Sequence, residues 1–274
     1  PVTDARTRAL TGISLWPAGC RINIDELLDD PLDSEDPALR TAAAGCLHLV
    51  IADRDNRIAR ALGDGHPRVR EAALRSLQQV TDDFVQTAIL WITDNQCNPR
   101  AQGTLLGALQ EMGLPSARYE AIAMRKINEA GSLQGAVAVL EEASVGVGDL
   151  PALELVRYTL SERMNQMLHL ALQALEPLHE PGLISIIRAG FSSGDSRHVA
   201  NAIEVLANLD DHNVAGQLHD ILQLSISKQT GKPAKADLRA LQEVLDWCRQ
   251  QKDDWLRHCA STVLSTLSPG NSRA

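Results

Sequence analysis

The sequence predicts an all-α protein in which antiparallel helix pairs stack side by side as an α-solenoid. A block of about twelve residues, opening with a polar residue followed by proline or a small residue, recurs along the chain. Each block continues with apolar and small residues at spacings of three and four, which is the period of one helix face. No segment shows the sustained alternation of apolar and polar residues that is typical of a strand. We therefore expect helices throughout.

The regular part of the pattern spans about residues 25–113. The prolines that open its three copies, Pro37, Pro67 and Pro99, are 30 and 32 residues apart, a period typical of helical repeats. Shorter amphipathic stretches lie between the copies, so each repeat is expected to contain two helices. In order, the copies read DPALRTAAAGCL (36–47), HPRVREAALRSL (66–77) and NPRAQGTLLGAL (98–109).

Each copy carries the residues that begin a helix. An Asp, His or Asn stands before the proline, where a polar side chain can accept the unpaired amide hydrogens of the first turn. Proline fits the first helical position because its missing N–H would have no partner there. Alanines follow on the apolar stripe, and these small residues allow a neighbouring helix to approach closely: Ala42, Ala43, Ala72 and Ala73.

Residues 114–268 predict an irregular helical continuation. We expect two helices over 116–142, broken near Gly131, and one long helix from about Pro151 to Glu176, ended by Pro177. Looser copies of the repeat block read GDSRHVANAIEVL (194–206) and DDWLRHCASTVL (253–264). We interpret Trp247 and Trp255 as apolar side chains that pack between the last helices and hold them together.

Two polar segments predict exposed chain. SKQTGKPAKA at 227–236 is expected to be a surface loop, and residues 269–274 a disordered tail. The sequence begins with Pro1 rather than Met, and its last helical pattern has no second helix after it. We therefore expect a piece of a larger protein or a processed chain. Its organisation is predicted to be a single solenoid over 1–274.

The DPxLR and HPxVR starts, their spacing and their Ala-rich helices resemble HEAT repeats, an armadillo-like architecture. The resemblance implies a right-handed superhelix of antiparallel helix pairs. A narrower resemblance rests on the order of elements over 153–209, with LEPLHEPGLISIIRAGFSSGD inside it, and on DDWLRHCA at 253–260. This order is similar to the soluble HEAT-repeat region attached to ATP/ADP-translocase-like or major-facilitator-like bacterial membrane proteins.

The narrower resemblance has implications for location and partners. It implies a cytoplasmic module, on the cytoplasmic face of a membrane protein, whose partners include adjacent domains of the same polypeptide. In such bacterial proteins a cyclic-nucleotide-binding domain often follows. Neither that domain nor the transporter segments occur in this sequence, so their activities are not assigned to these residues.

Composition disfavours several functional classes. The formal net charge is −9 and aromatic residues make up 3%, whereas nucleic-acid binding calls for a basic surface and bases stack on aromatic rings. No uncharged apolar run approaches the roughly 20 residues of a membrane-spanning helix. The five cysteines are scattered without a CxxC pair, which favours reduced thiols in a cytosolic core. We expect neither nucleic-acid binding nor direct membrane insertion.

The densest basic cluster spans residues 54–75. Arg57 and Arg60 lie three residues apart on a predicted inner, second helix, so they share a face. They are the candidate binding residues, forming a patch on the concave surface for phosphate or a carboxylate-rich partner. The competing interpretation is a solvated face of mixed charge. Arg40 and Arg70 recur at one position of the repeat, which favours pairing between repeats over contact with an acidic partner.

No constellation of residues predicts catalysis, a metal or a cofactor. Deoxyhypusine hydroxylases use repeated His-Glu pairs, but His179-Glu180 is a single pair followed by proline. His212 and His219 are seven residues apart, wider than the spacing that ligates metal on a helix, and His258-Cys259 are adjacent, so their side chains diverge. We therefore predict no catalytic residue and no metal ligand in this sequence.

The sequence favours a non-catalytic scaffold that binds another protein or an adjacent domain. Stacked repeats present an extended surface, and binding to it needs no catalytic group. The alternative is an enzyme on a HEAT scaffold, or a chromophore-handling protein like the phycobilin lyases, which also use stacked helix pairs. A nucleic-acid binder, like the HEAT-like DNA glycosylases, is the weaker alternative.

Overall fold

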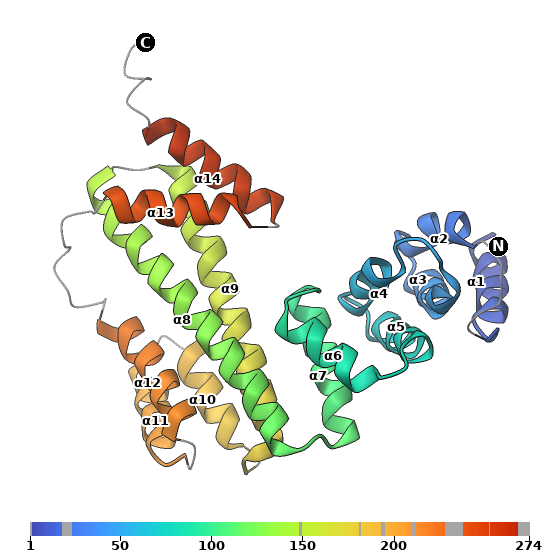
Figure 1. Ribbon diagram of the computed structural model, residues 1–274, viewed down its shortest axis with the longest axis horizontal. Helices are drawn as coiled ribbons and strands as arrows, with labels where there is room; N and C mark the ends of the chain where they lie inside the picture. The colour runs from blue at the N-terminus through green and yellow to red at the C-terminus, as the bar shows by residue number, and fades with distance from the viewer. Residues whose placement is uncertain are drawn as a thin grey trace. The chain divides into compact units, whose positions relative to one another are not determined.

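Every regular element in the described part of the chain is helical (Figure 1). The expectation of an all-α fold is thus confirmed. The expected tail at 269–274 and nearly all of the expected loop at 227–236 lie outside the described residues. The computed structural model describes residues 2–17, 24–147, 150–180, 182–192, 195–209, 212–227, 238–251 and 253–267.

The chain divides into two compact units, residues 1–122 and 123–274. The first unit holds α1 (Val2–Ile13), α2 (Asp25–Leu32), α3 (Pro37–Gly45), the short 3-10 helix η1 (Leu47–Leu49), α4 (Arg54–Leu62), α5 (Pro67–Val80), α6 (Phe84–Thr93), α7 (Pro99–Met112) and the start of α8 (Ser116–Val147). The second unit holds the rest of α8, then α9 (Pro151–Leu175), the 3-10 turn η2 (Glu176–Leu178), α10 (Leu183–Ser192), α11 (Ser196–Ala207), α12 (His212–Ser227), α13 (Leu238–Arg249) and α14 (Asp254–Leu267).

In the first unit, alternate helices pack against one another. α3 contacts both α1 and α5, and α5 contacts α7, so four helices that are not consecutive in the chain follow one another. The intervening helices pack beside them: α2 beside α3, α4 beside α5 and α6 beside α7. Each predicted copy of the repeat block begins one helix of the first set, namely α3, α5 or α7.

The predicted capping residues begin these helices, with one exception. The Asp36 carboxylate accepts the Ala38 amide hydrogen at 2.9 Å, and the Asn98 side chain accepts that of Ala101 at 2.9 Å. His66 stands at the same position before α5 but makes no side-chain capping bond. An imidazole is a poorer cap than a carboxylate or an amide.

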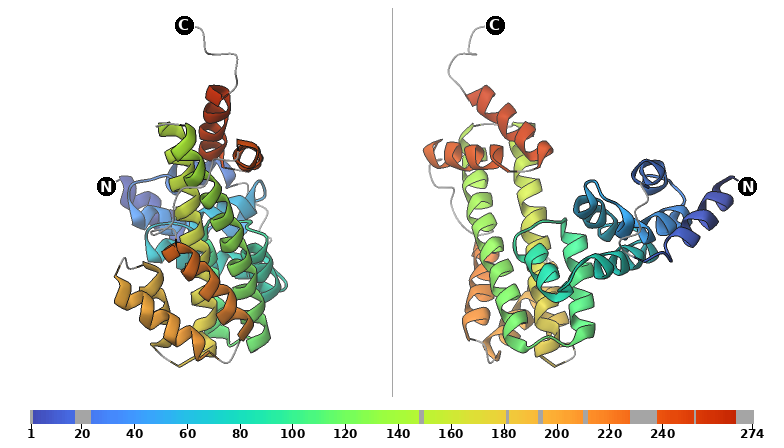
Figure 2. Two further views of the ribbon diagram at one scale, coloured as in Figure 1. Left: turned by 90° about the vertical axis from the view of Figure 1, so that its left-hand side faces the viewer. Right: turned by 45° about the vertical axis from the view of Figure 1, so that its right-hand side comes forward.

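Two long helices, α8 and α9, form the framework of the second unit and lie side by side in Figures 1 and 2. They are 32 and 25 residues long. At one end, α13 and α14 pack on them around a continuous apolar core. This core includes Leu140, Leu160, Leu245 and Leu256, one from each helix, all fully buried. At the other end, α10 packs on α9 and on α11, and α11 on α12.

The predicted break near Gly131 is wrong, because α8 continues through it. The buried stripe of this helix crosses the glycine, with Ile127, Ala130 and Gln134 all almost inaccessible to solvent. The Gln134 side chain also donates to the backbone carbonyl of Ile221 on α12 at 2.8 Å. A glycine costs a helix only about 1 kcal/mol, which this burial outweighs. The long helix predicted from Pro151 is confirmed and ends at Leu175.

The two tryptophans expected to staple the last helices together lie at the surface instead. Trp247 is 40% exposed and Trp255 is 55% exposed. The helix contact is made by the next residue in each case, Cys248 and Leu256, which are fully buried. Both tryptophans stand one position away from the apolar stripe, and one position is a rotation of about 100° around a helix.

None of the helices within the described ranges combines the length and the apolar character required for crossing a membrane.

Candidate functional site

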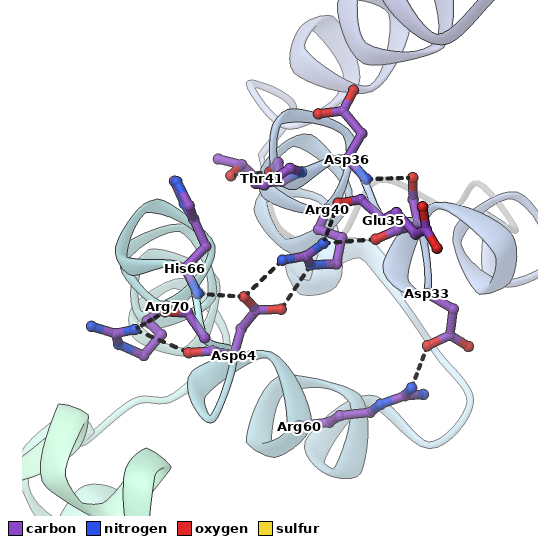
Figure 3. A network of polar contacts seen from close by, with 12 residues as sticks. Asp33, Glu35, Asp36, Arg40, Thr41, Arg60, Asp64, His66 and Arg70 are labelled. Atoms are coloured by element: carbon purple, nitrogen blue, oxygen red, sulfur yellow. Dashed lines mark hydrogen bonds and ion pairs between the residues drawn. The ribbon is translucent and has the colours of Figure 1, made fainter.

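The structure places Arg57 and Arg60 on α4, where each pairs with a carboxylate of the α2 segment. The Arg57 guanidinium lies 2.9 Å from Asp29 and also donates to the Asp25 backbone carbonyl at 3.1 Å. Arg60 forms an ion pair with Asp33 (Figure 3). The two arginines therefore share a surface, as expected, but a carboxylate within α2 and one directly after it neutralise that surface.

These residues line a groove of about 740 Å³, which we call the α2–α4 groove. Its charged lining comprises four aspartates and three arginines. Each of the three arginines, Arg40, Arg57 and Arg60, has a carboxylate partner. An anionic ligand would therefore have to displace ion pairs already present. The described residues that line it are Asp29, Leu32, Asp33, Ser34, Arg40, Asp53, Asn56, Arg57, Arg60, Ala61, Gly63, Asp64, Val69 and Asn98.

Arg40 connects successive repeats across this groove (Figure 3). Its guanidinium makes two hydrogen bonds to the Asp64 carboxylate, at 2.8 and 3.2 Å. It also donates to the backbone carbonyls of Ser34 and Glu35, at 2.7 and 3.1 Å. Both side chains are less than one fifth exposed. Arg40 thus stabilises the turn before α3 through its backbone hydrogen bonds and the turn before α5 through Asp64.

The same turn is closed in the same way in the next two repeats. Arg70 donates to the backbone carbonyls of Asp64 and Gly65, the residues six and five positions before it, at 3.0 and 3.1 Å. Gln102 replaces the arginine in the third copy and donates to the carbonyl of Cys97, five positions before it, at 2.9 Å. These residues brace the turns before their own helices, and the expected pairing between repeats is made by Arg40 alone, through Asp64.

The environment of the Arg40–Asp64 pair shifts both pKa values. Burial alone would raise the pKa of Asp64, but hydrogen bonds from Arg40 and from the His66 amide lower it below its ordinary value of 3.8. The hydrogen bond to Asp64 raises the pKa of Arg40, against the opposing effect of burial. The pair is therefore fully ionised at neutral pH, and it stabilises the turn.

A second groove, of about 760 Å³, lies along α1, α3 and α5, and we call it the α3–α5 groove. The α3 residues that line it are small, with Ala38, Thr41, Ala42 and Gly45 at helical spacings of three and four. No long side chain of α3 therefore fills the space beside α1 and α5. The described residues that line it are Thr11, Ser14, Leu15, Asp36, Pro37, Ala38, Thr41, Ala42, Gly45, His66, Arg68, Ala72, Arg75 and Gln79.

The α3–α5 groove has a different balance of charges from the α2–α4 groove. It holds two arginines, Arg68 and Arg75, and one carboxylate, Asp36, which already caps α3. Arg75 lies 3.4 Å from Glu71, and both side chains are more than 60% exposed. Such exposed pairs contribute only about 0.3–0.5 kcal/mol. Within the described part of the chain, the Arg68 side chain forms no ion pair or hydrogen bond.

The basic cluster of the sequence, over 54–75, includes Arg68 and Arg75, while Arg57 and Arg60 are its predicted binding residues. The spacing of Arg68 and Arg75 shows that they too share a helix face. Arg68, Ala72, Arg75 and Gln79 follow one another at intervals of four, three and four, so they share one face of α5. The carboxylates that pair with Arg57 and Arg60 come from a different helix, which the spacing within α4 could not reveal.

The residues considered for metal binding are not brought together. Over the ranges for which the structure is described, no group of three His, Cys, Asp or Glu side chains is arranged to hold a metal ion. His219 lies 3.8 Å from Asp220, its neighbour in sequence. Cys259 is buried while His258 is exposed, so the two side chains diverge as expected. The His212 side chain lies outside the described residues.

The buried cysteines are poor nucleophiles. Burial raises the pKa of the Cys46 thiol to about 12 and that of Cys248 to about 11. Cys259 has its pKa raised too, by burial and by the nearby Asp253 carboxylate. Because the thiolate is the reactive form, these three side chains serve the packing of the core.

The sequence matches no protein-family model, no curated protein and no solved structure.

Proposed function

We propose that this chain is a non-catalytic protein-interaction module, and that the α3–α5 groove is its binding surface. The observation that carries the proposal is the groove itself, about 760 Å³ along α1, α3 and α5, with small residues of α3 in its lining. A groove of this kind accommodates an extended segment or a helix of another protein. The free guanidinium of Arg68 supplies a polar contact that no described residue satisfies.

We also propose that the helix pairs are HEAT-like repeats of an α-solenoid. Support comes from the contacts among α1, α3, α5 and α7. It comes also from the turn brace, which recurs at Arg40, Arg70 and Gln102 with its acceptor five residues earlier each time. Residues that bind the same backbone position in successive units are what a repeat predicts.

The setting of the module is proposed from the order of its elements. The long helix followed by the block at 194–206 and the element at 253–260 resembles the cytoplasmic HEAT region of transporter-like bacterial proteins. On this proposal the chain acts in the cytoplasm as a region of a larger protein. Its partner is then an adjacent domain of the same polypeptide or a separate protein.

A peptide-display selection on the full chain tests the proposed function. The selected peptides are then measured against two variants that each obstruct one groove. Ala38→Trp places an indole in the α3–α5 groove, and Asn56→Trp places one in the α2–α4 groove; both positions are exposed. Unfolding midpoints show whether each variant remains folded.

The proposal expects enriched peptides that lose affinity for the Ala38→Trp variant and keep it for the Asn56→Trp variant. Peptides that bind both variants as they bind the parent chain would contradict the assignment of the groove. Repeated selections that enrich no peptide would contradict the interaction function itself.

A further inference from the structure

We propose that the occupant of the α3–α5 groove is an acidic segment of a partner protein, and that Arg68 and Arg75 bind its carboxylates. This inference rests on the proposed function and specifies the chemistry of the partner.

The charge of the groove is opposite to that of the chain. The whole protein carries 35 acidic and 26 basic residues, yet the described lining of the α3–α5 groove carries two arginines and a single aspartate. The Asp36 carboxylate accepts the Ala38 amide hydrogen at 2.9 Å, so it is already engaged at the start of α3. A cationic groove on an acidic molecule favours acidic ligands over basic ones.

The arginines of this groove are available, unlike those of the α2–α4 groove. Arg68 has no partner among the described residues, and Arg75 has only the exposed Glu71 carboxylate at 3.4 Å. In the α2–α4 groove, each arginine already pairs with an aspartate. Carboxylates entering the α3–α5 groove gain charge-assisted hydrogen bonds without breaking a strong ion pair.

The spacing of the two arginines predicts the spacing of the acidic residues. Arg68 and Arg75 are seven residues apart on α5, which corresponds to about 10 Å along the helix axis. A segment in the polyproline-II conformation covers about 9 Å in three residues, which make one full turn, so side chains three positions apart lie on the same side. Two carboxylates three positions apart on such a segment can therefore reach the two guanidinium groups together.

Other lining groups suit a polypeptide better than a nucleic acid. His66 lines the groove, and its Nδ1 atom is buried without a hydrogen-bond partner. Gln79 and Ser14 add amide and hydroxyl groups, and alanine and glycine add small apolar surface. The described lining contains no Phe, Tyr or Trp ring on which a base could stack. Two arginines are also few for binding a strand of phosphates.

Fluorescence anisotropy with the full chain tests the inference. The probe is a labelled peptide of about twelve residues with glutamate at every third position and proline or alanine between, since three residues make one polyproline-II turn of about 9 Å. Its counterpart carries lysine in place of each glutamate. The variants are Arg68→Glu and Arg75→Glu. The matched control is Arg100→Glu, because Arg100 follows the proline of α7 as Arg68 follows that of α5, outside the groove lining.

The acidic probe is expected to bind and the basic probe not to bind. Each groove variant should weaken binding about tenfold or more, and Arg100→Glu should leave it within about twofold. Affinity should fall as salt is added, because exposed charges are screened. No binding of the acidic probe below about 1 mM, equal binding of the basic probe, or equal loss in the Arg100→Glu variant would overturn the inference.

Two further outcomes separate this inference from the proposed function. Display-selected peptides that are blocked by Ala38→Trp but insensitive to Arg68→Glu and Arg75→Glu would overturn the acidic partner and leave the binding groove standing. A single-stranded oligonucleotide that displaces the acidic probe, and whose binding depends on the same two arginines, would overturn it in favour of nucleic acid.

Discussion

Arg40 and Arg70 occupy one position of the repeat and use it to hold turns. Both donate to the two backbone carbonyls that lie six and five residues earlier. Arg40 alone has an acidic partner in the next repeat, Asp64. In the third copy the position is Gln102, whose side chain is neutral and makes the equivalent bond to Cys97. The role that these three residues share is hydrogen bonding to the turn, and the ion pair with Asp64 is made by Arg40 alone.

Removing the carboxylate of Asp64 should therefore destabilise the first unit. Asp64→Asn leaves Arg40 charged and about four fifths buried, so we expect a loss of about 1–3 kcal/mol in the free energy of unfolding at pH 7. Urea titration measures the change. The control is Asp33→Asn, whose exposed pair with Arg60 should contribute less than about 1 kcal/mol. Equal effects of the two substitutions would contradict the bracing role.

The same pair predicts a dependence on pH. The folded-state pKa of Asp64 lies below its ordinary value of 3.8. The stabilisation is therefore complete above the unfolded-state pKa and is lost as pH falls through the folded-state pKa. Between pH 6 and pH 3 the parent chain should lose more stability than the Asp64→Asn variant. Parallel curves of stability against pH for the two proteins would contradict the stabilising role of the Arg40–Asp64 ion pair.

The buried thiols should resist alkylation in the folded protein. With the pKa of Cys46 near 12 and that of Cys248 near 11, only about one thiol in a thousand or fewer is ionised at pH 8. Iodoacetamide labelling followed by mass spectrometry should modify both residues quickly in concentrated guanidinium and very slowly in buffer. Rapid labelling of either residue in buffer would contradict the burial of its thiol.

At the scale of elements, helix starts follow from sequence and some helix ends do not. The repeat blocks locate the starts of α3, α5 and α7 because proline and a capping side chain determine the first turn locally. The continuity of α8 through Gly131 depends on burial of the residues around it, which is decided by other helices. The same limitation applies to Trp247 and Trp255, whose exposure depends on how α13 and α14 are rotated.

Substitution of two helix glycines by alanine should change the stability of the protein in opposite directions. A Cβ atom added at Gly190 on α10 would lie 2.3 Å from the Ala202 Cβ on α11, while one at Gly131 would meet no atom within 4 Å. Gly190→Ala should cost about 1–3 kcal/mol of stability by overpacking. Gly131→Ala should stabilise α8 by about 0.5–1 kcal/mol. Thermal unfolding compares both with the parent, and a destabilising Gly131→Ala would indicate a break in α8.

At the scale of the whole molecule, the sequence predicts the class of fold better than the site. Helical period and caps are local properties, so the all-α fold follows from them. The grooves depend on side chains from helices distant in sequence. Carboxylates of the α2 segment neutralise Arg57 and Arg60, whereas Arg68 meets no described partner. The single solenoid over 1–274 remains a prediction, and the chain divides into two compact units near residue 122.

Methyl NMR of the full chain, labelled at alanine, shows directly whether a bound peptide occupies the α3–α5 groove. A peptide obtained by display selection is titrated into the protein, and alanine resonances are followed. Occupation of the α3–α5 groove predicts progressive shifts at the alanines that line it, Ala38, Ala42 and Ala72. Ala61, which lines the α2–α4 groove, should remain unchanged. Shifts at Ala61 without shifts at the other three would contradict the assignment of this groove as the binding surface.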